Sequence, residues 1–336
     1  MFVFGWTKHA QKKSASGWQS VGLFGSLLLC SLLILTGCAR REQTAQGYKP
    51  SKAGVSRPQP TPTPDPFDWV WSMRIPEDRL LLYYYIPGAP WGFLGSYNDQ
   101  GVLAQAKKQS DAYEKLDPSH PVISGLDIAS PVVIGEPGPG GYYSAFSSPK
   151  LIQHYIDLAT QNHMLFFFDM QIGRAPLLKE METIWPYLEQ PNVELALDPE
   201  FALDSHGIPD VNLGHMTAAE INPVIDGLAL LVKENELPPK MLVIHQWQES
   251  MLPDWYNIRP KYGVQVLTCS DGFGTPGQKI ADYRVFDDER LIQYPAFKLF
   301  YPNFPGTSPH PTLDEPFMSP EDVLKLNPVP VMIMYQ

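Results

Sequence analysis

Short apolar stretches alternate along the chain with longer segments in which apolar residues recur every three or four positions. Short runs bounded by turn residues predict buried strands, and the longer period predicts amphipathic helices. Runs such as Leu165-Phe166-Phe167-Phe168 are apolar at every position, which indicates parallel strands covered on both faces. The strand pattern is found in residues 80–86, 122–128, 164–170, 193–198, 241–246, 264–270, 296–301 and 331–335.

Helical segments separate these predicted strands. Thr217 and Glu220 have the spacing of a capping box, and Ser319 followed by Pro320 is a favoured helix start. The alternation of strands and helices begins near Arg79 and continues to the end of the sequence, close to the length of about 250 residues typical of an eight-fold barrel. The predicted helices are residues 98–116, 148–161, 175–189, 217–236, 253–261, 277–288 and 319–326.

We therefore expect an α/β fold, a (β/α)8 TIM barrel of parallel strands from which the eighth helix is missing. The apolar segment 67–75, with Trp69 and Trp71, is suited to covering that gap or closing the barrel floor. The alternative is an open doubly wound sheet, which usually carries a glycine-rich phosphate-binding turn after its first strand. Here the first strand is followed by Pro87-Gly88-Ala89-Pro90 without a GxGxxG motif, which favours the barrel.

The N-terminal segment has the features of a secretory signal peptide. Lys8, Lys12 and Lys13 precede an apolar run over residues 21–35, which is short for a membrane-spanning helix. The run ends in Leu35-Thr36-Gly37-Cys38, which resembles the lipobox of bacterial lipoproteins and implies that Cys38 carries a lipid. An uncleaved N-terminal anchor is the alternative. Either arrangement places the remaining chain outside the cytoplasm on a membrane.

These features divide the chain into three parts. Residues 1–37 are the expected signal peptide, residues 38–66 the lipidated cysteine and a proline-rich linker, and residues 67–336 the barrel. Proline-rich segments such as 58–66 favour extended polyproline II spacers. Beside Cys38, the mature chain would keep only Cys269, which excludes an internal disulfide and a cysteine-rich zinc cluster.

Charge narrows the range of partners. The signal peptide contains three of the 25 Lys and Arg residues and no acids, so its removal would change the net charge from −11 to −14. An acidic exported domain is a poor binder of nucleic acid and of anionic lipid. The expected membrane contact is therefore the lipid on Cys38.

Polar side chains follow nearly every predicted strand. In barrel enzymes the active site lies at the carboxyl ends of the strands. Because side chains alternate between faces, Asp169 and Gln171 share a face, and so do Asp198 and Glu200. Buried carboxylates need partners, and Lys298 on the seventh strand is the obvious internal counter-charge. The residues at strand ends are Asp127, Asp169, Gln171, Asp198, Glu200, His245, Gln246, Asp271, Lys298, Tyr301 and Tyr335.

Each of these residues also has a structural interpretation. Asp198 and Asp271 are compatible with simple turns, Asp127 with a structural role, and His245 with a core histidine. Aromatic residues in the loops, such as Trp91, suit either sugar stacking or loop packing. Structural roles alone do not explain why acids, His, Lys and Gln coincide at strand ends around most of the ring.

Several segments prompt a resemblance to a group of bacterial TIM-barrel lipoproteins of unassigned activity. They are residues 195–200, 244–246, 271–274 and 298–301 and the terminal Tyr335-Gln336. The resemblance implies the barrel fold and an exported location. More loosely, the barrel is similar to exported polygalactosaminidase-like and spherulin-like glycosidases.

The leading hypothesis is a glycoside hydrolase acting on a poly- or oligosaccharide without a cofactor or metal. Such enzymes need a protonated and an ionised carboxyl group. Asp169 and Glu200 are the expected pair, with Asp198 as the next choice. The expected substrate-binding residues are Gln171, His245, Gln246, Asp271, Lys298, Tyr301, Tyr335 and Trp91.

Two other functions are compatible with the sequence. One is a metal-dependent hydrolase or isomerase, although only one strand-end histidine and no HxH or HExxH motif are present. Its ligands would come from Asp169, Asp198, Glu200, His245 and Asp271. The other is a non-catalytic carbohydrate-binding lipoprotein, because a barrel scaffold does not by itself imply catalysis.

Overall fold

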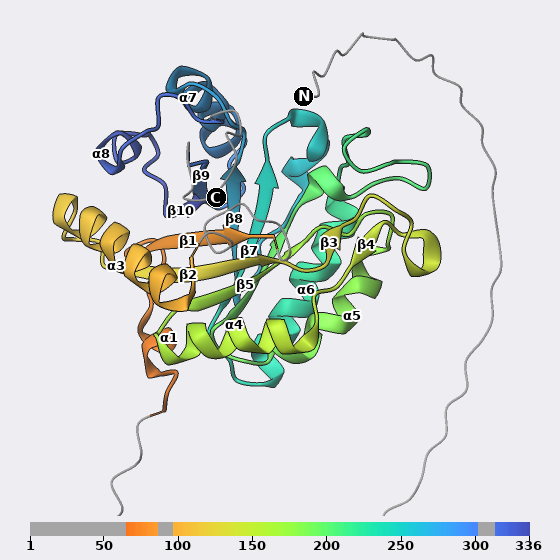
Figure 1. Cartoon of the computed structure of the whole chain (residues 1–336), viewed down its shortest axis with the longest axis horizontal. Helices are drawn as coiled ribbons and strands as arrows, with labels where there is room; N and C mark the ends of the chain where they lie inside the picture. Colours follow the sequence, from red (N-terminus) through yellow and green to blue (C-terminus); the bar gives the residue numbers. More distant parts are fainter. Residues whose placement is uncertain (1–64, 87–96, 302–312) are drawn as a thin grey trace, which may run out of the picture. The chain divides into compact units, whose positions relative to one another are not determined.

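The central feature of the computed structural model, which describes residues 65–86, 97–301 and 313–336, is a closed barrel of parallel strands (Figure 1). Each barrel strand pairs with the next one along the chain, and the last pairs with the first, with Leu80 opposite Met332. All eight predicted strands are confirmed, with bounds that differ by no more than two residues. The barrel strands are β1 (Arg79–Tyr85), β2 (Val122–Ala129), β5 (Leu165–Met170), β6 (Val193–Leu197), β7 (Lys240–Gln246), β8 (Val264–Ser270), β9 (Tyr294–Leu299) and β10 (Met332–Tyr335).

Helices lie around the outside of these strands (Figure 1). The predicted caps are present: Thr217 and Glu220 form a capping box, and the side chain of Ser319 accepts a hydrogen bond from Asp322 N. A short hairpin of β3 (Val132–Val133) and β4 (Ser144–Ala145) follows β2. The helices are α1 (Asp68–Ser72), α3 (Asp99–Leu116), α4 (Pro149–Gln161), α5 (Leu177–Leu188), α6 (Ala218–Glu234), α7 (Pro276–Arg284) and α8 (Pro320–Val323).

The helix predicted over residues 253–261 is wrong. The segment instead contains the 3-10 turn Trp255–Asn257, and another such turn, Glu249–Met251, precedes it. Pro260 lacks an N–H donor and disfavours the helical conformation of the residue before it. The remaining stretch is too short to offset the cost of helix nucleation. The helix predicted over 277–288 is present as α7, which continues into a π-helical turn, Val285–Glu289.

Strand residues form two separate apolar layers. Alternate positions such as Leu82, Phe167 and Val243 fill the barrel interior, whereas their neighbours pack against the helices. Ile75, with Trp69 and Met73 around it, packs against the interior cluster. The segment that contains α1 therefore contributes to the barrel core, as the sequence predicts.

A buried pair of charged residues joins the start of β7 to β6. The backbone N–H of Met241 donates to Glu194 Oε2 at 2.6 Å, and Lys240 Nζ donates to the carbonyl oxygens of Gln190 at 2.6 Å and Val193 at 2.8 Å. Burial raises the pKa of Glu194 to about 7, against the opposing effects of Lys240 and the Met241 bond. The same burial lowers the pKa of Lys240.

Several sequence predictions lie outside the described residues. They concern the signal peptide, the lipid on Cys38, the proline-rich linker and Trp91. Among the described helices, none combines the length and the apolar character needed to cross a membrane.

Candidate active site

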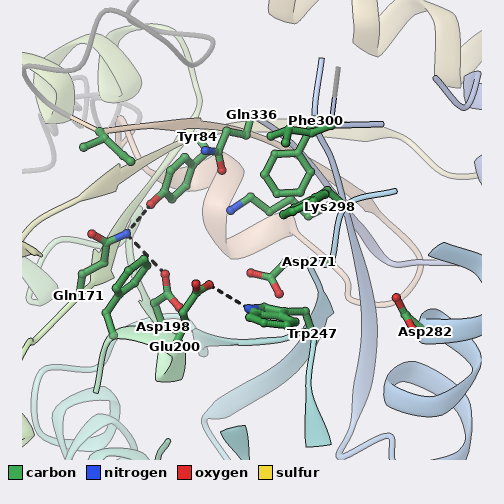
Figure 2. Close-up of a pocket in the computed structure, with 15 residues that line it drawn as sticks. Tyr84, Gln171, Asp198, Glu200, Trp247, Asp271, Asp282, Lys298, Phe300 and Gln336 are labelled. Carbon is green, nitrogen blue, oxygen red and sulfur yellow. Dashed lines mark hydrogen bonds between the residues drawn. The ribbon is translucent and has the colours of Figure 1, made fainter. Parts of the chain in front are cut away.

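A pocket of about 410 Å³ opens at the carboxyl ends of the barrel strands (Figure 2). Tyr84, on β1, and Phe300, just after β9, contribute aromatic walls, and Phe201 and Phe273 come from the connections after β6 and β8. This is the end of a TIM barrel that carries catalytic residues in enzymes of this fold. The polar lining consists of Gln171, Asp198, Glu200, Asp271, Asp282, Lys298 and Gln336.

A tight turn after β6 brings two acids into the pocket. Asp198 is followed by the 3-10 turn Pro199–Phe201, and both Asp198 and Glu200 line the cavity. Gly214 N donates to Glu200 O at 2.7 Å. A Cβ at position 214 would lie 2.6 Å from that oxygen, so this close approach requires glycine.

Glu200 is half-buried, and its Oε2 accepts a hydrogen bond from Trp247 Nε1 at 2.9 Å. Burial raises the pKa of Glu200, and the negative charge of Asp271 raises it further. The Trp247 bond and the charge of Lys298 oppose these effects without cancelling them. Glu200 is therefore a carboxyl group that keeps its proton to higher pH than an ordinary glutamate.

Asp198 is the more deeply buried of the two acids. Burial raises its pKa well above the usual range, and the charge of Asp169 adds to the effect. Gln171 Nε2 lies 3.5 Å from Asp198 Oδ2 and donates a closer hydrogen bond, at 2.9 Å, to the Tyr84 hydroxyl. Gln171 therefore connects β1 to the turn after β6.

His245 lies directly below the pocket and contacts two acids from other strands. Its Nε2 is 3.4 Å from Asp169 Oδ2, and its Nδ1 is 3.2 Å from Asp271 Oδ2. Burial lowers the pKa of His245, but the charge of Asp169 and the contact with Asp271 outweigh burial and raise it well above its usual range. His245 is thus fixed between the carboxyl groups of Asp169 and Asp271.

Lys298 reaches into the pocket from β9 (Figure 2). Its Nζ lies 4.0 Å from the centre of the Tyr84 ring and 5.3 Å from that of Phe300. Its charge lowers the pKa of Asp169 and Glu200, against the larger effect of burial. Lys298, the predicted counter-charge, therefore acts on these acids through space. Its ammonium group packs over the faces of the two aromatic rings.

The loop that carries Asp271 is held by a buried ion pair. Lys279 Nζ lies 3.2 Å from Asp314 Oδ2 and donates to the carbonyl oxygen of Gly272 at 2.5 Å. Asp314 also accepts hydrogen bonds from Gly274 N at 3.0 Å and from Phe300 N at 2.8 Å. One aspartate thus ties the loop after β8 to the end of β9.

The structure brings most of the predicted residues together, but not all. The predicted residues that line the pocket are Gln171, Asp198, Glu200, Asp271 and Lys298. Asp169 is fully buried beneath the pocket. This position corrects the expectation that Asp169 and Glu200 act as a pair at the substrate.

Three predicted substrate-binding residues point away from the pocket. Gln246 donates to Gln248 O at 3.3 Å, Tyr335 is hydrogen-bonded to the hydroxyl of Tyr113 at 2.7 Å, and Tyr301 stacks on Tyr335. Each follows an inward-facing residue by one position, so strand alternation turns it toward the helices. Their expected contact with substrate is corrected accordingly.

Some pocket residues are not among the predicted site residues. Tyr84 is hidden in an apolar run, although its two-residue spacing from Leu82 places it on the inner face. Asp282 comes from α7, away from any strand end, and no local pattern marks it.

A TIM barrel supports many unrelated activities, so the fold alone does not define a reaction. No protein-family model matches the chain, and no curated protein sequence matches it either. Function is therefore inferred from the chemistry of the pocket: several carboxyl groups, one of them half-buried with a raised pKa, surrounded by aromatic rings.

Proposed function

We propose that the protein is a glycoside hydrolase that acts on a poly- or oligosaccharide. The observation that carries the proposal is that Glu200 and Asp271 line the same pocket and that the negative charge of Asp271 contributes to the raised pKa of Glu200. Glycosidic bond cleavage uses one carboxyl group that donates a proton and a second one that is ionised. A carboxyl group whose pKa is raised beside a second carboxylate supports the role of proton donor for Glu200.

In this proposal Glu200 is the general acid and protonates the leaving oxygen. Asp271 is the ionised partner, which acts as nucleophile or as base toward water. The contact of Asp271 with His245 Nδ1, at 3.2 Å, holds its carboxylate in one orientation. Asp198 and Gln171, on the same side of the pocket as Glu200, are placed to hydrogen-bond sugar hydroxyls (Figure 2).

The aromatic lining supports a sugar as the ligand. Trp247 and Phe273 are 36% and 62% exposed, although both are large apolar side chains that line the pocket. Exposed aromatic rings beside convergent polar groups are typical of ligand sites. Their flat faces suit the C–H faces of sugar rings, whereas the carboxylates and amides suit the hydroxyls.

The N-terminal sequence supports an extracytoplasmic substrate. The lipobox-like segment that ends in Cys38 implies a lipid-anchored protein whose barrel meets cell-surface or environmental polysaccharide. The looser resemblance to exported polygalactosaminidase-like glycosidases agrees with this substrate class.

Hydrolysis of a panel of poly- and oligosaccharides, measured by the release of reducing ends, tests the proposal. E200Q and D271N should each reduce kcat about 10²–10⁴-fold, the usual contribution of a general acid or base. E182Q and D288N, which change exposed acids, are matched controls that should keep the parental rate. E200Q should melt at the same or a higher temperature, because it removes a charge that Asp271 repels.

The proposal fails if E200Q and D271N remain as active as their controls. It also fails if the parent protein cleaves none of the panel. Sugar binding without cleavage would instead identify a carbohydrate-binding protein.

A further inference from the structure

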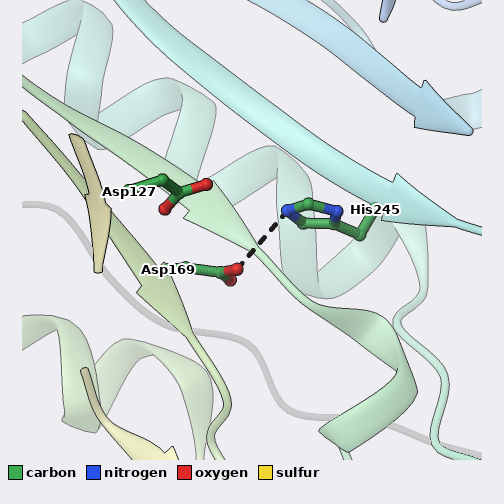
Figure 3. Close-up of side chains that lie close together, drawn as sticks. All are labelled: Asp127, Asp169 and His245. Atoms are coloured by element: carbon green, nitrogen blue, oxygen red, sulfur yellow. Dashed lines mark ion pairs between the residues drawn. The ribbon is translucent and has the colours of Figure 1, made fainter. Parts of the chain in front are cut away.

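A second group of polar side chains lies beneath the pocket, on β2, β5 and β7. Asp127, Asp169 and His245 are fully buried, and each offers one ligand atom within 4.8 Å of the other two. Figure 3 shows the two carboxylates directed toward the imidazole. We propose that these three residues bind one divalent transition-metal ion. The inference does not depend on the proposed glycosidase activity.

The first support is the lack of other partners. Both carboxylate oxygens of Asp127 are buried, and neither has a hydrogen-bond partner among the residues that the structure describes. The same is true of the carboxylate oxygens of Asp169, one of which lies 3.4 Å from His245 Nε2. Buried polar groups in proteins are nearly always paired, so side chains of this kind aimed at one point indicate a missing ligand.

The second support is the separation between His245 and Asp169. The 3.4 Å between Nε2 and Oδ2 is longer than the about 2.7–2.9 Å of a charge-assisted hydrogen bond. Two ligands that are each about 2.1 Å from a tetrahedral Zn²⁺ lie about 3.4 Å from one another. The pair is therefore spaced as two ligands of a common ion.

The third support comes from the other ring nitrogen. His245 Nδ1 lies 3.2 Å from Asp271 Oδ2. Metal-binding histidines usually donate their second N–H to a carboxylate or carbonyl, which fixes the tautomer. Binding of the ion would release the proton from Nε2, and His245, with its remaining proton on Nδ1, would then direct the lone pair of Nε2 toward Asp127 and Asp169. Asp271 would then connect the ion to the pocket above.

The donor set narrows the choice of ion. One imidazole with two carboxylates suits Zn²⁺ or Mn²⁺ better than Mg²⁺ or Ca²⁺, which prefer oxygen ligands alone. Asp198 lines the pocket above, and its Oδ1 has no hydrogen-bond partner in the described part of the chain. Its carboxylate marks a polar route for a cation from the pocket to the site.

Metal binding to the full chain tests the inference directly. The purified protein is treated with a chelator and titrated with Mn²⁺, followed by the electron paramagnetic resonance signal of free Mn²⁺. Zn²⁺ content is measured by elemental analysis. One ion per chain is expected. D271N should weaken binding about 10–100-fold, as expected for a residue that orients a ligand, and D127N and H245Q should weaken it more.

D288N and H206Q change exposed residues of the same types and should bind metal as the parent does. Circular dichroism shows whether each variant forms the barrel, and D169N replaces D127N if the latter does not fold. A parent protein without a stoichiometric ion overturns the inference, and so does parental binding by D127N and H245Q. Because the assay uses no substrate, its result stands whether or not the protein cleaves sugars.

Discussion

The indole Nε1 of Trp247 donates a hydrogen bond of 2.9 Å to Oε2 of Glu200. Trp247 follows β7 and Glu200 follows β6, and these two strands are neighbours in the barrel. Hydrogen bonding to a carboxylate stabilises its charged form, so the indole lowers the pKa that burial and Asp271 raise. One aromatic side chain thus lines the pocket and also sets the acidity of the proposed proton donor.

Replacing Trp247 by Phe should therefore shift the pH profile of hydrolysis. A general acid works only while protonated, so kcat/KM falls as pH rises through the pKa of Glu200. Without the indole bond that pKa rises further, and W247F should lose activity at higher pH than the parent. W71F, an exposed tryptophan on α1, is the control. An alkaline limb that stays in place or moves down would show that Trp247 does not control Glu200.

The membrane anchor gives a separate prediction. If Cys38 accepts the lipid, C38A should leave an unprocessed precursor or release the barrel from the membrane fraction. C30A, in the apolar run of the expected signal peptide, should mature and partition normally. Fractionation and mass spectrometry of the mature protein measure both effects. Normal maturation and membrane partitioning of C38A would refute lipidation at this residue.

The alternation of side chains explains both the successes and the errors of sequence-based reasoning at the strand ends. It correctly places Asp198 on the inner side, in line with Ala196, whereas Glu200 reaches the pocket through the 3-10 turn Pro199–Phe201. The same rule excludes Tyr301 from the face of Lys298, because the two are an odd number of positions apart. Gln246, next to His245, is excluded in the same way. The two-residue alternation of side chains along a strand therefore excludes both Tyr301 and Gln246 from the pocket face.

Depth in the barrel is not visible in the sequence. Asp169 lies opposite Ala196 in the pairing of β5 with β6, so it is two positions below the level of Asp198. This register buries Asp169 beneath the pocket, although its strand-end position resembles that of Asp198. The Lys279–Asp314 pair is a similar case, because its two residues lie far apart in the sequence and no local pattern connects them.

The buried Glu194 predicts a pH dependence of stability. Its pKa rises from an ordinary 4.5 to about 7 in the folded protein. The folded state therefore binds more protons than the unfolded state between these values, and the stabilisation present below pH 4.5 is lost as pH rises through about 7. Within this interval, Glu194 lowers the free energy of unfolding by at most about 1.4 kcal/mol for each unit by which the pH rises.

E194Q should flatten that dependence. Glutamine keeps an oxygen that can accept the hydrogen bond from Met241 N, and Lys240 retains its carbonyl acceptors. Chemical unfolding at several pH values across the interval measures the slope, with E182Q as an exposed control. An equally steep slope in E194Q would assign the dependence to other groups.

Lys298 should matter for folding as well as for the pocket. It is 5% exposed and its charge lowers the pKa of Asp127, Asp169 and Glu200, against the larger effect of burial. Methionine keeps the unbranched shape but removes this charge. K298M should lose on the order of 1–3 kcal/mol of stability, the typical cost of leaving a buried polar group uncompensated.

The loss in K298M should depend on pH with a definite sign. Attraction between Lys298 and the carboxyl groups exists only while those groups are ionised, so parent and variant should differ more near pH ~8 than near pH ~5. K150M removes an exposed lysine and should change stability by less than about 1 kcal/mol at either pH. Thermal melting of the parent and both variants at the two pH values measures these differences. If K298M melts like K150M, the acids of the pocket are already neutral without Lys298, and its role is confined to the faces of Tyr84 and Phe300.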